Sequence, residues 1–245
     1  MPIGKIRVGT RKYSGGKFID PDLEGYTSIV SLTKTSPYGS LSPYLLRTPS
    51  GVILENYYQF SKVYEEVPRS VQTKNQYDKT IIWDHPGEIH IENGVPNKRY
   101  FKWRRKGMKT QYPVRWPVGK IHSKKCLYSI PEHNFELRLG YVDSRKQIYL
   151  RSYLETVVKE PLFEELRNRV ANGENLLIIE VDGPHQESLG YYMETYQVSK
   201  LFIQESTVRV TKRHLKILIN DTKHPFGHGY CLAAALLGIK EEDLD

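Results

Sequence analysis

Two short, continuous apolar segments constrain the fold of this chain more than any other feature. LLIIEV at residues 176–181 has no polar alternation, which predicts a buried strand, and CLAAALLG at residues 231–238 predicts the last helix. Neither segment approaches the roughly 20 residues that a membrane-spanning helix needs. With 39% hydrophobic and 26% charged residues, the chain is typical of soluble globular proteins.

Helical spacing of apolar residues dominates the second half of the sequence. It predicts helices at residues 143–160, 161–170 and 211–221, and a further helix at 52–67 that Pro68 ends. Residues 1–27, rich in glycine and charge, are expected to be irregular. We therefore expect one α+β domain over residues 1–245, with a helix-rich core, a small β-sheet, and residues 69–142 as a basic aromatic insertion or lid.

The chain contains two cysteines, Cys126 and Cys231, and this usage favours a reducing compartment. The basic N-terminus lacks the apolar segment of a secretory signal, so we expect a cytoplasmic protein without membrane partners. GxSxG, P-loop and GxGxxG motifs are all missing from the sequence. His224, His228 and Cys231, or His122 and Cys126, have spacings that permit metal binding, but we expect no metal and no cofactor.

The net charge of +8 is concentrated in one segment. Residues 98–125 contain 11 Lys or Arg and no Asp or Glu, whereas the remaining chain has 25 basic and 28 acidic residues. Aromatic side chains alternate with these charges, a pattern that suits phosphates and stacked bases. The alternative is a solvated loop whose aromatic residues pack on the main domain. The residues expected to contact nucleic acid are Lys102, Trp103, Arg104, Arg105, Lys106, Arg115 and Trp116.

The stretch ENYYQFSK, residues 55–62, combines polar and aromatic positions. On a continuous helix, Glu55, Gln59 and Lys62 would share one face, while Tyr57, Phe60 and Tyr64 would pack inward. An ordinary amphipathic surface helix explains this pattern, and so does the wall of a pocket.

A second polar stretch, residues 220–238, joins two expected helices through a glycine-rich corner. Asp221 ends the first helix, and Gly227 and Gly229 let the backbone approach a ligand. Free N–H groups at the start of the last helix suit a phosphate. A simple helix-to-helix corner is the alternative.

Taken together, these stretches resemble the NADAR family, which has a YbiA-like fold and a predicted link to NAD and ADP-ribose. The turn YGSLSPY at residues 38–44, the helix motif at residues 55–62, and Asp221 with the later FGHG and Leu-Gly carry the resemblance. Pro43, Asn56 and Phe226 depart from the family pattern.

The resemblance implies cleavage of N-glycosidic bonds, with removal of ADP-ribose or a related ribosyl adduct from a nucleobase, guanine in nucleic acid above all. A carboxylate would stabilise the positive charge that builds on the ribose. Lys62 would attack the anomeric carbon. The implied catalytic residues are Glu55, Lys62 and Asp221. The implied substrate-binding residues are Tyr38, Gly39, Ser42, Tyr58, Gln59, Phe226, Gly227, His228 and Gly229.

Three other functions fit the same residues. The first is a non-catalytic module that binds ADP-ribose or a nucleotide. The second is a nucleic-acid-binding protein in which the fold only presents the basic segment. The third is a glycosidase that acts on a free nucleotide metabolite.

Overall fold

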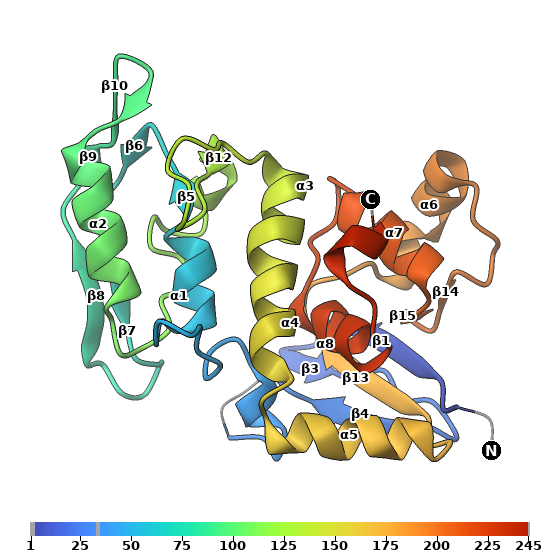
Figure 1. Cartoon of the computed structure of the whole chain (residues 1–245). Coiled ribbons are helices and arrows are strands. Elements are labelled where there is room, and N and C mark those ends of the chain that lie inside the picture. Colours follow the sequence, from blue (N-terminus) through green and yellow to red (C-terminus); the bar gives the residue numbers. More distant parts are fainter. Residues whose placement is uncertain (1–2, 33–34, 245) are drawn as a thin grey trace. The chain divides into compact units, whose positions relative to one another are not determined.

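The computed structural model describes residues 3–32 and 35–244 of the chain. The chain divides into two compact units, residues 1–42 with 150–245 and residues 43–149, and we describe each by itself (Figure 1). Both units contain helices and strands, which confirms the mixed α+β class. Within the described ranges, no helix is both long and apolar enough to cross a membrane.

The first unit is built around a five-stranded sheet in the order β14-β15-β1-β13-β4. β13 (Leu176–Glu180) lies between β1 (Ile6–Thr10) and β4 (Thr27–Val30) and is parallel to both. β15 (Thr207–Arg209) pairs antiparallel with β1, and β14 (Ile203–Gln204) pairs antiparallel with β15. Every residue of β13 is buried, as its continuous apolar run predicts.

Strand β1 lies where the sequence predicts an irregular segment, so that prediction is wrong for these residues; residues 1–2 lie outside the described part. All of β1 is buried, including Arg7, whose Nε donates to Thr207 Oγ1 at 2.7 Å. A side chain at Gly9 would place its Cβ 2.5 Å from Pro21 Cγ. Arg7 and Gly9 therefore interrupt the apolar pattern of this strand. Only tertiary contacts explain why these two residues occur there. A short exposed hairpin follows, formed by β2 (Lys12–Ser14) and β3 (Lys17–Ile19).

The helices of the first unit follow the predicted periodicity. They are α4 (Arg151–Val157), α5 (Pro161–Ala171), α6 (Leu189–Tyr196), α7 (Lys212–Asn220) and α8 (His228–Leu236). α8 is buried along its whole length and contacts β1, β13, α4, α5 and α7. Burial on all sides explains why its sequence carries almost no polar residues.

The second unit has a hydrophobic core of its own, in which α1 (Leu54–Gln59) contacts α2 (Lys98–Met108). Short strands pair around them: β5 (Lys62–Val63) with β12 (Tyr128–Ser129), β6 (Glu66–Val67) with β9 (Glu88–Ile89), β7 (Ser70–Thr73) with β8 (Ile81–His85), and β10 (Ile91–Glu92) with β11 (Val95–Pro96). The core residues are Phe60, Val63, Tyr64, Val67, Trp83, Tyr100, Trp103, Val114, Val118 and Ile130. Residues 69–142, expected as an insertion or lid, supply more than half of this core.

The helix predicted at residues 52–67 is only partly correct, because α1 ends at Gln59. The Ser61 hydroxyl donates to the Tyr58 carbonyl at 2.7 Å, which occupies one of the carbonyls left at the helix end. Lys62 and Val63 then pair as a strand with residues 128–129. Packing of Val63 in the core therefore overrides the helical periodicity of the local sequence.

The helix predicted to begin at Asp143 starts earlier. It opens with α3 (Tyr141–Ser144), whose N-cap is Gly140, and continues through a π-helical segment, Arg145–Leu150. Such segments are uncommon and often lie at functional sites.

Candidate functional site

Glu55, Gln59 and Lys62 form a continuous chain of polar contacts in the second unit. The Gln59 Nε2 donates to Glu55 Oε1 at 3.0 Å, and the Lys62 Nζ donates to Gln59 Oε1 at 2.9 Å. Glu55 is 8% exposed. An acid, an amide and an amine are thus aligned in the order that the sequence predicts.

Two different elements position these three groups. Glu55 and Gln59 are one turn apart on α1, whereas Lys62 lies on β5. The prediction that Lys62 extends a helical stripe is therefore wrong, although its amine still reaches Gln59. The Lys62 Nζ also lies 4.3 Å from the centroid of the Tyr58 ring, a distance typical of cation–π contacts.

Tyr58, predicted to bind substrate, is held by further aromatic and polar neighbours. Its ring centroid is 4.7 Å from that of Tyr149. Burial raises the pKa of Tyr58, so its hydroxyl stays protonated at neutral pH. In the same unit Arg145 and Lys146 are 2% and 8% exposed. Neither cation is among the residues that the resemblance assigns to the site.

Asp221 lies in the first unit and is fully buried. Its carboxylate accepts hydrogen bonds from the hydroxyls of Tyr191 (2.9 Å) and Tyr192, from His224 Nδ1 (2.7 Å) and from the Lys223 N–H (2.9 Å). Burial acts to raise the pKa of Asp221, but these hydrogen bonds outweigh it and lower the pKa. The charge is thus stabilised by groups of the protein itself.

The glycine corner encloses a carboxylate of the protein. Glu180, at the end of β13, is 2% exposed, and its Oε2 accepts the Gly229 N–H at 2.6 Å and lies 3.2 Å from His228 Nδ1. A Cβ at Gly227 would lie 2.3 Å from Glu180 Cδ. The expectation that this corner offers free N–H groups to a phosphate is therefore wrong for Gly229. The signal that could have identified Glu180 is an acidic residue at the end of a buried strand.

The remaining predicted substrate-binding residues also belong to the first unit. Phe226 is buried and stacks on Tyr230 at 5.3 Å between ring centroids. The Tyr38 hydroxyl accepts a hydrogen bond from Arg169 Nη1 at 3.0 Å. Gly39 begins a short 3-10 helix, and Ser42 is fully buried just after it.

Helix α2 carries the first half of the basic segment, and it contradicts two predicted nucleic-acid contacts. Trp103 is 1% exposed within the aromatic core. Arg104 is also buried, and its Nη1 donates to the Ile130 carbonyl at 2.8 Å and to the Tyr100 hydroxyl at 3.1 Å. Both side chains therefore hold the unit together. Lys102, Arg105 and Lys106, by contrast, are exposed.

The second half of the basic segment keeps an exposed aromatic residue. Trp116 is 39% exposed, and the Arg115 guanidinium lies 4.5 Å from its ring centroid. Lys120 Nζ lies 5.9 Å from the same ring. The arrangement places two cations beside one partly exposed ring.

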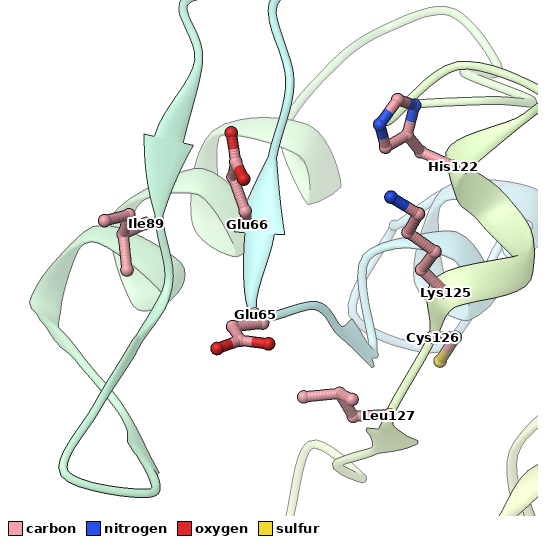
Figure 2. Close-up of a pocket in the computed structure, with 7 residues that line it drawn as sticks. All are labelled: Glu65, Glu66, Ile89, His122, Lys125, Cys126 and Leu127. Carbon is pink, nitrogen blue, oxygen red and sulfur yellow. The ribbon is translucent and has the colours of Figure 1, made fainter.

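A cavity of about 480 Å³ lies elsewhere in the second unit (Figure 2). Glu65 and Glu66 lie opposite Lys125 and His122, so its walls have opposite charge. Burial raises the pKa of Cys126, which also lines the cavity and therefore remains a thiol near neutral pH. Neither Glu55 nor Lys62 is among the lining residues.

Protein-family models, curated proteins and solved structures were all compared with the chain, and none matches it.

One group of described side chains has the composition of a metal site: His85, Glu88 and His90. It differs from both cysteine-containing sets weighed from the sequence.

Proposed function

We propose that the protein is an N-glycosidase that removes ADP-ribose, or a related ribosyl adduct, from a nucleobase, with guanine in nucleic acid as the first candidate. The observation that supports this proposal is the chain from Glu55 through Gln59 to Lys62. Its acid, amide and amine are the residue types that the resemblance to the NADAR family associates with this chemistry.

In the proposed mechanism, Lys62 Nζ first loses a proton to solvent. The neutral amine then forms a bond to the anomeric carbon while the bond from that carbon to the nucleobase nitrogen breaks, and the leaving base takes up the second proton that the amine loses as the new bond forms. Opening of the ribose ring gives a Schiff base, and water releases the sugar and restores the amine. Glu55 stabilises the positive charge that develops on the ribose, and Gln59 holds the carboxylate and the amine in register.

The direct test uses DNA that carries ADP-ribose on guanine. Micromolar protein should release free ADP-ribose, and borohydride should trap the sugar on the protein. Lys62→Ala should abolish both results, whereas Lys17→Ala, at an exposed lysine of β3, should change neither. Release of no ADP-ribose by the intact protein would contradict the proposal, and an adduct that persists in Lys62→Ala would remove Lys62 from the mechanism.

A second candidate function is nucleic-acid binding without catalysis, and the exposed Trp116 with Arg115 favours it. This function predicts salt-sensitive binding to DNA or RNA that is unchanged by Glu55→Gln and Lys62→Ala. The ligand-binding module predicts affinity for ADP-ribose without turnover. Comparing the rates of cleavage of a free nucleotide and of a modified nucleic acid distinguishes a glycosidase that acts on a metabolite from one that acts on nucleic acid.

A further inference from the structure

Three side chains that can bind metal converge in the second unit, where the chain passes from β8 to β9. His85 is the last residue of β8, Glu88 opens β9, and His90 follows it. Their ligand atoms all lie within 4.8 Å of one another. The Nε2 atoms of His85 and His90 lie 2.9 Å and 2.8 Å from the same Glu88 oxygen, Oε1.

The cluster leaves buried nitrogen atoms without hydrogen bonds. His85 is 6% exposed and His90 is fully buried. His85 Nε2 makes no hydrogen bond despite its short distance to Glu88, and His90 Nδ1 also has no hydrogen-bond partner. Buried polar atoms are nearly always paired, so such atoms in a native fold call for a ligand or another explanation.

Aromatic neighbours fix the orientation of both imidazole rings. Trp83 stacks on His85 with a centroid distance of 5.6 Å and an interplanar angle of 16°. Trp103 contacts His90 edge-on at 5.2 Å. Held in this way, the two nitrogen ligands lose little further freedom when an ion binds.

Charged groups of both signs lie around the cluster. Glu88 supplies the one carboxylate of the three candidate ligands. Lys106, whose Nζ lies 5.0 Å from the Trp83 ring centroid, is the opposing positive charge. The Glu88 side chain is 19% exposed and provides the entry from solvent.

We propose that His85, Glu88 and His90 bind a divalent transition-metal ion, with zinc the best match. Two imidazoles and one carboxylate are a ligand set of zinc sites that keep a fourth position for water. Imidazole ligands exclude magnesium and calcium, which prefer oxygen. Ligand bonds of about 2.0–2.1 Å require the Glu88 oxygen to move away from each nitrogen by a few tenths of an ångström. This site is independent of the proposed glycosidase chemistry.

The sequence gives no familiar signal for this site. HPGEIH places its ligands at the first, fourth and sixth positions, whereas the helical zinc motif HExxH places two histidines one turn apart. The turn between β8 and β9 brings them together instead.

The test uses the full chain, purified without a metal-binding tag and stripped with a chelator. Zinc chloride titrated by calorimetry should bind at one ion per chain and raise the thermal midpoint by several degrees. Cobalt(II) should give the visible absorption bands of a nitrogen- and oxygen-ligated ion.

Glu88→Gln and His85→Gln should each weaken zinc binding more than about 100-fold. His133→Gln, at an exposed histidine of the same unit, is the matched control and should bind zinc like the parent. Because Glu88 is partly exposed, its variant should keep the fold, which circular dichroism checks. Absence of stoichiometric zinc binding by the parent, or undiminished binding by both ligand variants, would overturn the proposal.

Discussion

Asp221 and Glu55 are the two carboxylates to which the resemblance to the NADAR family assigns catalytic roles, and the structure surrounds them differently. Asp221 is fully buried and accepts hydrogen bonds from two tyrosines, a histidine and a backbone N–H. Glu55 accepts from a side-chain amide, and this amide in turn accepts from the Lys62 amine.

The two environments lead to different expectations for the two acids. The donors around Asp221 come from α6 and from the segment after α7, so the carboxylate ties separate elements of the first unit together. Glu55 instead begins a short series of hydrogen bonds through Gln59 to Lys62, on α1 and on β5. We call this series the relay. We therefore expect substitution of Asp221 to act mainly on stability and substitution of the relay to act mainly on activity.

The largest effect is expected for Asp221→Asn. The amide presents a donor where the carboxylate accepts, and it leaves buried hydroxyls without a charged partner. We expect a loss of about 3–5 kcal/mol in the free energy of unfolding, measured with urea at neutral pH. Tyr191→Phe, which removes one donor, should cost only about 1 kcal/mol. A stable Asp221→Asn protein that has lost only activity would contradict this view.

The same carboxylate predicts a pH dependence. Because the folded-state pKa of Asp221 is lowered, its contribution is fully present above the unfolded pKa of about 3.9. The contribution should disappear as the pH falls through the lower, folded-state pKa. Urea unfolding between neutral and acid pH should therefore show a difference between the parent and Asp221→Asn that shrinks only in the acid range.

The next effect concerns the corner that encloses Glu180. Gly227→Ala places a Cβ 2.3 Å from Glu180 Cδ, and either the carboxylate or the start of α8 must move. We expect a loss of about 1–3 kcal/mol in unfolding free energy. Gly190→Ala on α6, where a Cβ meets nothing within 4 Å, should be neutral or stabilise the protein by up to about 1 kcal/mol. Equal stability of the two variants would show that Glu180 does not need the glycine.

A smaller effect separates two cations on α2. Arg104→Met removes donors from the buried Ile130 carbonyl and should cost about 1–2 kcal/mol in unfolding free energy. Lys102→Gln, at an exposed position, should leave stability unchanged and reduce the salt dependence of DNA binding by about one charge. DNA binding that depends on Arg104 but not on Lys102 would reverse the assignment.

The sequence predicts elements well where the local pattern and the tertiary environment agree. Strand β13 is a continuous apolar run with a neighbouring strand on each side, and α5 has a buried apolar stripe. Strand β1 is not predicted because two of its residues, Arg7 and Gly9, do not fit an apolar pattern. Arg7 is explained by its hydrogen bond to Thr207, and Gly9 by its close contact with Pro21, and neither contact can be read from the local sequence.

The candidate site follows the same rule. The order of Glu55, Gln59 and Lys62 was predictable, whereas the end of α1 was not, since it depends on pairing with β12. The basic segment mixes both cases: its charge was correctly located, but burial of Trp103 depends on an aromatic cluster gathered from many parts of the unit. Helical periodicity cannot distinguish a ring that stacks on a base from one that fills a core.

The smallest effects on stability are expected in the relay itself. Glu55→Gln and Lys62→Met each remove one charged hydrogen-bonding group, and the Met side chain keeps its contact with the Tyr58 ring. We expect unfolding free energies within about 1 kcal/mol of the parent. If the proposed chemistry is correct, Lys62→Met should abolish release of ADP-ribose, and Glu55→Gln should reduce it by about 100-fold or more. Urea unfolding and the release assay on the same samples separate the two quantities. A loss of several kcal/mol of unfolding free energy in either variant would show that the relay, like Asp221, stabilises the fold.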